Sequence, residues 1–236
     1  MALPKLDTAP KYELTVPSTG EKIRYRPFLV KEQKILLIAY ESQDKKQIVN
    51  AMLDACNTCI QDDVDVYNLA IFDIDYIFTQ IRAKSVGENV PLEVTCSNCQ
   101  IGNEVVINLE NIKIKQEKVS NIIQLTDSIK LIMKFPTYQT FLNNQELLNN
   151  NSGTELIMEL IVASLDTIQT EEENIIIKDE SREDIIDFID SMTGSQFEMI
   201  SKYIESMPQM RYDIKFKCKA CNTDNEHTLQ GIDDFF

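Results

Sequence analysis

Two Cys-x-x-Cys motifs, far apart in the chain, constrain the fold more than any other feature of this sequence. Cys96 and Cys99 form the first motif, Cys218 and Cys221 form the second, and 118 residues separate the two motifs. Each motif stands between segments that alternate apolar and polar residues like β-strands, so each is expected at the tip of a hairpin. Two cysteines three positions apart on a tight turn can direct both sulfurs at one point. Two such turns together supply the four thiolates that zinc accepts.

We therefore predict a structural zinc site made by Cys96, Cys99, Cys218 and Cys221. Such a site is closed to substrate, because protein atoms fill all four coordination positions. Four thiolates suit iron as well as zinc, and four reduced, buried cysteines without a metal are the alternative. Zinc ribbons often place Gly after the second Cys, where a left-handed backbone is useful. Here those two positions hold Gln100 and Asn222 instead.

Composition and charge narrow the class of function. The chain has 236 residues, 43% of them hydrophobic, and a formal net charge of −15. We expect a real apolar core and no binding of nucleic acid through a broadly basic surface. No apolar run is long enough to span a bilayer, and the N-terminus lacks the pattern of a signal peptide. In a reducing cytoplasm, paired cysteines bind metal or remain thiols, and an acidic protein more often meets other proteins.

Apolar periodicity predicts an α+β fold. The first part is expected to form a hairpin over 11–28 and helices over 29–41, 43–60 and 72–83, with Ser42 and Asp73 as N-caps of the last two helices. The next elements are expected as strands 90–94, 104–109 and 112–115, a hairpin of 121–125 with 129–135, a helix over 136–148, and a helix that the Ser152 cap opens and that runs to about 164. The last elements are expected as a hairpin of 166–169 with 174–178, helices 182–191 and 194–205, and strands 211–217 and 226–229.

Two regions are expected on this basis. Residues 1–89 would form an N-terminal hairpin and helices, and residues 90–236 an α+β region closed by the two cysteine hairpins. One continuous domain is the alternative. Capping boxes, which pair a Ser or Thr N-cap with a polar residue three positions later, are expected at Ser152, Ser181 and Thr193.

The residues that usually carry catalysis are scarce. The chain has one histidine, His227, and six glycines that do not cluster into a phosphate-binding loop. A third Cys-x-x-Cys pair, Cys56 and Cys59, lies on or beside the apolar stripe of the predicted helix 43–60. It is either a redox or second metal pair, or part of the packing. We predict that the protein is not an enzyme but a binding or structural protein.

Two segments resemble a baseplate protein family of T-even-type contractile-tailed bacteriophages. The first is residues 17–40, with the core Arg-Pro-Phe-Leu-Val-Lys-Glu at 26–32, and the second is residues 72–88. The segment Asp-Phe-Phe at 234–236, after a cysteine hairpin, is also similar. The resemblance covers most of the chain in order and brings no catalytic motif.

The resemblance implies a structural component of the baseplate hub in the virion, assembled in the host cytoplasm. A hub assembly chaperone that is absent from the mature virion is the alternative. We expect a zinc-stabilised adaptor that docks other hub proteins through apolar surfaces of helix 29–41 or through the N-terminal hairpin, without membrane insertion. A zinc-ribbon module that binds nucleic acid is a third reading, and its local support is Arg211, Lys215, Lys217 and Lys219.

Two smaller expectations concern charged and terminal residues. Arg24 and Arg26 are two apart, so they share one face of their strand and could pair with acids of a partner or of this chain. Phe235 and Phe236, on an acidic segment, are expected to act as a docked anchor.

Overall fold

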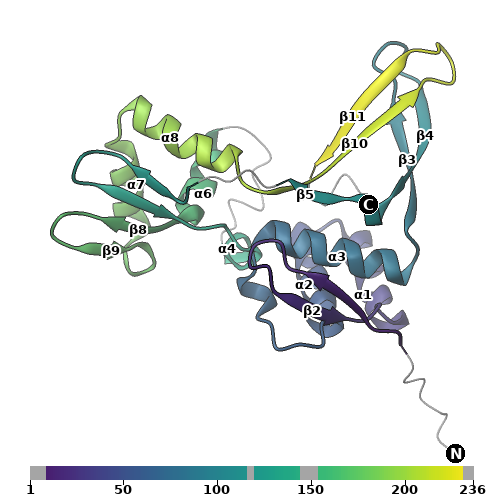
Figure 1. The fold of residues 1–236 in the computed structure, drawn as a ribbon, viewed down its shortest axis with the longest axis horizontal. Helices are drawn as coiled ribbons and strands as arrows, with labels where there is room; N and C mark the ends of the chain where they lie inside the picture. Colours follow the sequence, from purple (N-terminus) through teal and green to yellow (C-terminus); the bar gives the residue numbers. More distant parts are fainter. Residues whose placement is uncertain (1–8, 116–119, 144–153, 231–236) are drawn as a thin grey trace, which may run out of the picture. The chain divides into compact units, whose positions relative to one another are not determined.

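The computed structural model describes residues 9–115, 120–143 and 154–230. The chain divides into two compact units, one made of residues 1–115 with 209–236 and the other of residues 116–208. The second unit is therefore an insertion between two strands of the first. Both units combine helices with small antiparallel sheets, which confirms the predicted α+β class (Figure 1).

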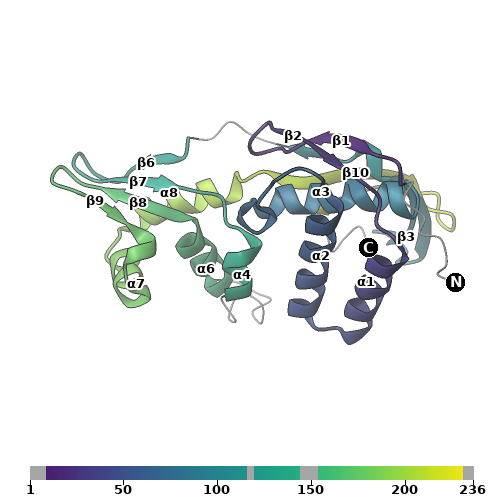
Figure 2. The same cartoon turned by 90° about the horizontal axis from the view of Figure 1, so that it is seen from below.

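The first unit opens with a hairpin and three helices. Strands β1 (Tyr12–Thr15) and β2 (Lys22–Tyr25) pair antiparallel, and the chain turns between them at Gly20, whose φ is 72°. The helices are α1 (Val30–Ser42), α2 (Lys45–Cys59) and α3 (Ile71–Ser85). Figure 2 shows α1 beside α2, with α3 running across them. Branched side chains such as Ile23, Leu53 and Ile77 are completely buried here, and they account for the apolar periodicity of these segments.

Two further hairpins complete the first unit. Strands β3 (Asn89–Thr95) and β4 (Gly102–Asn108) form one sheet, and β10 (Gln209–Lys217) and β11 (Asp224–Gln230) pair in another. The short strand β5 (Lys113–Lys115) joins the second sheet, whose order is β11-β10-β5. Apolar residues from α3 and from both sheets share one cluster, which includes Ala83, Val94, Ile107, Met210 and Leu229. This cluster fixes the two hairpins to α3.

The second unit is built on a four-stranded antiparallel sheet of order β6-β7-β8-β9. Its strands are β6 (Ile122–Gln124), β7 (Lys130–Met133), β8 (Leu165–Gln169) and β9 (Asn174–Ile176). Its helices are α4 (Tyr138–Asn143), α6 (Thr154–Ser164), α7 (Arg182–Asp190) and α8 (Gly194–Glu205). Sheet and helices enclose one apolar core around Leu131, Ile161, Leu165, Ile189 and Ile200.

The structure corrects two expected helix caps. Asp44, not Ser42, caps α2, and its carboxylate accepts hydrogen bonds from the N–H groups of Lys46 and Gln47. Ala70 is the N-cap of α3, and Asp73 lies within its first turn, where the carboxylate accepts bonds from the N–H and hydroxyl of Ser18, at 2.9 and 2.5 Å, in the first hairpin. The Asp73 carboxylate, which the sequence pattern predicts as a local helix cap, therefore binds a residue far away in the chain instead.

Two of the three expected capping boxes lie in the described residues. Thr193 caps α8 and forms the complete box with Gln196. Ser181 caps α7 by accepting from the N–H of Asp184. The expected box at Ser152 and the end of the expected helix 136–148 lie outside the described residues.

The division into units also differs from the expected boundary at residue 89. Strand β3 and the first cysteine motif belong with the preceding helices, because Val90 and Val94 pack in one cluster with Ala83 of α3. Within the described ranges, no helix combines the length and the apolar character needed to cross a lipid bilayer.

Candidate metal centre and interaction surface

The two cysteine motifs occupy turns of the same backbone geometry. In the β3–β4 turn, the N–H of Cys96 donates to the carbonyl of Ile101, and the N–H of Gln100 donates to the carbonyl of Cys96. The β10–β11 turn repeats both hydrogen bonds at the equivalent residues. Gln100 and Asn222 have φ values of 60° and 57°, the left-handed region that Gly usually provides. Both turns therefore keep the left-handed conformation, although neither position is occupied by Gly.

The structure brings together the sulfurs of the four predicted residues. All four Sγ atoms lie within 4.8 Å of one another. The Sγ of Cys96 is 3.6 Å from that of Cys221, and the Sγ of Cys99 is 3.6 Å from that of Cys218. A tetrahedral site with metal–sulfur bonds of about 2.3 Å has sulfurs about 3.8 Å apart. Each close pair takes one sulfur from each hairpin, so the set could bind one metal ion between the hairpins.

The pKa values of the thiols differ within the cluster. Hydrogen bonds with the hydroxyl and the backbone N–H of Thr223 lower the pKa of Cys221 to about 6. The backbone N–H of Ile101 lowers the pKa of Cys99, but burial and the three neighbouring sulfurs outweigh it and bring that pKa to about 12. Four thiolates this close together require a cation to offset their charge, and a bound metal provides one.

Two asparagines, Asn103 and Asn225, connect the hairpins around the sulfurs. Asn103 accepts from the backbone N–H of Lys219 at 2.8 Å, and its amide nitrogen lies 3.7 Å from the Sγ of Cys218. Asn225 accepts from the N–H of Ser97 at 2.9 Å, and its amide nitrogen lies 3.5 Å from the Sγ of Cys96. Each hairpin thus holds the backbone beside the first cysteine of the other. Such outer contacts orient the ligands of a metal site.

Sequence reasoning missed these asparagines, although the sequence contains a signal for them. Both motifs continue as Cys-x-x-Cys-x-x-x-Asn-Glu, with the asparagine four positions after the second cysteine. Asn103 and Asn225 are also among the few buried polar residues in the described ranges. The repeat of the whole pattern identifies a reciprocal contact that the cysteine spacing alone does not indicate.

The third cysteine pair lies away from this cluster, inside the helical part of the first unit. Cys56 and Cys59 of α2 are both buried, and both are free thiols. Burial raises the pKa of Cys59 to about 11 and that of Cys56 well above its ordinary value. Unreactive thiols on the buried side of a helix agree with the packing interpretation.

The proposed basic support for nucleic-acid binding lies on the exposed side of β10. Alternate residues of β10 face the same way, so Arg211, Lys215 and Lys217 share this side with Asp213. Lys215 pairs with Glu226 of β11 at 3.2 Å, and Arg211 lies 3.5 Å from Asp213. Acids are interleaved with the bases, so the surface has no continuous basic patch along this strand.

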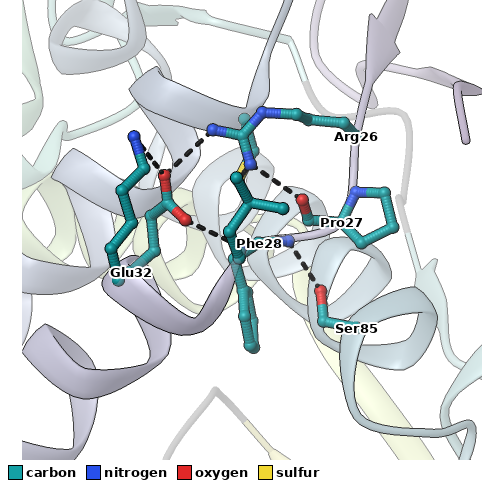
Figure 3. Close-up of polar contacts among 8 residues, drawn as sticks. Arg26, Pro27, Phe28, Glu32 and Ser85 are labelled. Atoms are coloured by element: carbon teal, nitrogen blue, oxygen red, sulfur yellow. Dashed lines mark hydrogen bonds and ion pairs between the residues drawn. The ribbon is translucent and has the colours of Figure 1, made fainter. Parts of the chain in front are cut away.

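The segment Arg-Pro-Phe-Leu-Val-Lys-Glu at 26–32 forms a polar latch at the start of α1 (Figure 3). Arg26 donates to the carboxylate of Glu32 at 2.9 Å and to the carbonyl of Pro27 at 2.9 Å. The second Glu32 oxygen accepts from the N–H of Leu29 at 2.7 Å, which caps the helix. The N–H of Phe28 donates to the hydroxyl of Ser85 on α3 at 2.9 Å.

This latch joins the two segments that carry the family resemblance, 17–40 and 72–88. The structure also shows whether Arg24 and Arg26 pair with acids of this chain. Arg26 pairs with Glu32, and Arg24 pairs with Asp62 through its backbone N–H and its guanidinium. Both arginines therefore bind acids of this chain.

Helix α1 presents an apolar face that nothing in the described residues covers. Val30, Ile35 and Ile38 are exposed by 66%, 55% and 64%, and Lys31 and Lys34 lie on the same side of the helix. We call these five residues the outer face of α1. The buried side carries Leu36 and Ala39 instead, so the dense apolar run of the sequence divides into a core side and an exposed side.

Comparison with known proteins gives one full-length relative. The baseplate hub assembly protein gp26 of Enterobacteria phage T4 is 20% identical over 229 residues, which cover 96% of this chain and 98% of that protein. No solved structure matches the chain. A family model described as T4 bacteriophage base plate protein matches residues 9–236, which include both cysteine motifs and the latch. The chain therefore belongs to the T4 base plate protein family.

Proposed function

We propose that this baseplate protein is a structural component of the hub of a contractile phage tail and acts there as a zinc-stabilised adaptor between other baseplate proteins. The outer face of α1 carries the proposal. A cluster of exposed apolar side chains marks a site of protein interaction. The latch of Arg26 and Glu32 fixes the first turn of α1, so the face is presented on a rigid support.

The outer face also indicates the chemistry of its partner. Lys31 and Lys34 stand between the apolar side chains, so the partner surface would be apolar with acidic residues around it. The likeness to a baseplate hub assembly protein supports a partner among the hub proteins. Nucleic-acid binding, membrane insertion and catalysis form no part of the proposal.

The metal is proposed to be zinc with a structural role. All four ligands come from the protein, and the second unit lies in sequence between the two cysteine pairs. Zinc would therefore join residues far apart in the chain and leave no position for substrate. Elemental analysis of the purified protein, with zinc and iron measured together, identifies the metal. We expect one zinc per chain.

A substitution on the outer face tests the docking role. Ile38→Glu places a charge on the outer face without touching the core, and should reduce capture of other baseplate proteins from assembling tails by about tenfold or more. Val106→Glu is a matched control, because Val106 of β4 is 60% exposed. Equal capture by both variants would contradict docking through α1.

A second role within the same assembly is favoured by the name of the relative, which is a hub assembly protein. The chain would then act during hub construction and be absent from the finished particle. Quantitative mass spectrometry of purified virions and of infected-cell lysate separates the two roles. A small-integer ratio to a tail protein of known copy number in virions supports the structural role, and abundance in lysate alone supports the assembly role. Absence from virions and from all tail intermediates would contradict both.

A further inference from the structure

A second apolar feature of the first unit lies on another side of α1 from the outer face. It is a groove between α1 and α3, with a volume of about 260 Å³. Apolar side chains form most of its wall, and they include Phe28, Leu37, Tyr40 and Val86. Arg82 of α3 is the cationic residue in the wall. The volume is below the roughly 300–1,000 Å³ of typical small-molecule sites, so a few side chains suit the groove better than a cofactor.

We propose that residues 231–236 of this chain, Gly-Ile-Asp-Asp-Phe-Phe, occupy the groove between α1 and α3. These residues lie outside the described part of the structure. Their side chains match the groove both in apolar character and in charge. Ile232, Phe235 and Phe236 supply apolar and aromatic side chains for an apolar wall, and Asp233 and Asp234 supply carboxylates for Arg82.

The position at which the described chain stops places the segment within reach. Leu229, near the end of β11, is buried in the same cluster as Ala83, which is adjacent to Arg82 in α3. Met210, in the neighbouring strand β10, has its sulfur 3.4 Å from the hydroxyl of Thr79, one turn earlier in α3. Six residues span roughly 20 Å when extended, and passing around one side of a helix of about 10 Å diameter needs less than this.

The other end of the chain matches the groove less well. Residues 1–8 contain no aromatic side chain, and their single acid, Asp7, is offset by Lys5. The C-terminal segment has two aromatics, two acids and no base. Charge and side-chain type therefore both favour residues 231–236 as the occupant.

Docking of this segment would couple the end of the chain to the latch. Phe28 lines the groove, and its backbone N–H is bonded to Ser85 of α3. A segment seated beside Phe28 would contact both α1 and α3 and hold the two helices together. The outer face of α1 would remain open to a partner, because its residues do not line the groove.

A photo-crosslinker at the end of the full chain tests this proposal. Phe236→p-benzoylphenylalanine is irradiated in the purified protein, and the joined peptides are identified by mass spectrometry. We expect cross-links within one chain, from residue 236 to the segments 28–40 or 78–86. Their yield should not change on dilution, because the reaction is intramolecular.

Two adjacent substitutions provide the matched comparison. Leu37 lines the groove and is 55% exposed, whereas Ile38 belongs to the outer face and is 64% exposed. Leu37→Glu should lower the cross-link yield about tenfold or more, because it places a carboxylate against an apolar, acidic segment. Ile38→Glu should leave the yield unchanged, even though it weakens capture of other baseplate proteins.

Three outcomes would overturn the proposal. Cross-links found only in covalent dimers would assign the groove to a second copy of the chain. Cross-links to other segments, or no cross-links, would leave the groove to a partner protein. Equal loss of yield in Leu37→Glu and Ile38→Glu would show that the segment does not distinguish groove from outer face. Circular dichroism of each variant verifies that it is folded.

Discussion

The two units of this protein are assembled from the chain in different ways. In the first, residues from opposite ends of the chain meet, and four sulfurs join the β3–β4 hairpin to the β10–β11 hairpin. In the second, one continuous segment folds a four-stranded sheet and its helices around an apolar core. The first unit combines its buried apolar cluster with polar and sulfur contacts between residues far apart in the chain, whereas apolar contacts within one continuous segment hold the second unit together.

This difference has a thermodynamic reason. Bringing together residues separated by more than a hundred positions costs loop-closure entropy, and the proposed metal site would offset that cost with a few strong bonds. A compact segment of about ninety residues closes shorter loops, and burial of apolar area alone can offset their smaller entropy cost. The two units should therefore respond to different perturbations.

The largest effect is expected from loss of one of the four proposed metal ligands. Cys96→Ser should remove the metal and most of its binding free energy, roughly 10–16 kcal/mol for structural zinc. Hydrogen exchange should accelerate in β3, β4, β10 and β11 and stay unchanged in the second unit. Cys56→Ser, at a buried cysteine outside the cluster, should keep full metal content. If Cys96→Ser melts like the wild type and still captures its partners, zinc does not close the first unit.

The complementary test makes a cavity in the apolar core of the second unit and leaves the first unit unaltered. Leu131 is completely buried, so Leu131→Ala should lower the free energy of unfolding of that unit by about 2–5 kcal/mol. Metal content should not change. Ile122→Ala on the neighbouring strand β6, where the side chain is 51% exposed, should cost less than about 0.5 kcal/mol. Loss of metal from Leu131→Ala would show that the two units do not respond independently.

A smaller effect is expected at the latch of the first unit. Glu32→Gln removes the charge that Arg26 pairs with and should cost about 1.5–3 kcal/mol at pH 7, measured by denaturant unfolding. Glu41→Gln, at the exposed end of the same helix, should be close to neutral.

The latch also predicts a pH dependence. Burial acts to raise the pKa of Glu32, but Arg26 and the N–H of Leu29 outweigh it and hold the pKa below its usual 4.5. The carboxylate therefore contributes its full stability above pH 4.5 and loses it as the pH falls through the lower folded pKa. The difference in unfolding free energy between wild type and Glu32→Gln should shrink in that range. A constant difference would mean that the ion pair does not contribute.

The smallest effect is expected from the asparagines around the sulfurs. Asn103→Ala should weaken metal affinity by about 10–100-fold, measured by competition with a chelator, because it removes a contact that orients the Cys218 turn. Asn225→Ala should have a similar effect through the Cys96 turn. Asn89→Ala, at the exposed start of β3, is the control and should leave metal affinity unchanged.

Much of the candidate site can be predicted from sequence, because its information is local. The spacing of two cysteines on a turn depends on neighbouring residues, and the alternation around each motif places both turns on hairpins. The outer face of α1 was less predictable. The run Ile-Leu-Leu-Ile-Ala-Tyr at 35–40 indicates an apolar helix, but only packing against the rest of the unit decides that Leu36 is buried and Ile38 exposed.

Helix caps show the same limit. Thr193 and Gln196 lie three positions apart, so their reciprocal bonds could be read directly from the sequence. Asp73 stands at a position that suits a cap, yet it binds Ser18, which is 55 residues away. A sequence pattern does not show whether a side chain will bind a neighbouring residue or a distant residue of the same chemistry.

The sequence by itself determined the α+β class, the sequence of strands and helices, the family and the four cysteines that converge. These depend on periodicity, turn chemistry and residue order, which are properties of neighbouring residues. Only the tertiary structure decided where the chain divides, which acids bind Arg24 and Arg26, and that Asn103 and Asn225 each reach across to the opposite hairpin. These depend on which distant surfaces meet when the chain buries its apolar area, and the identity of the residues alone does not specify that pairing.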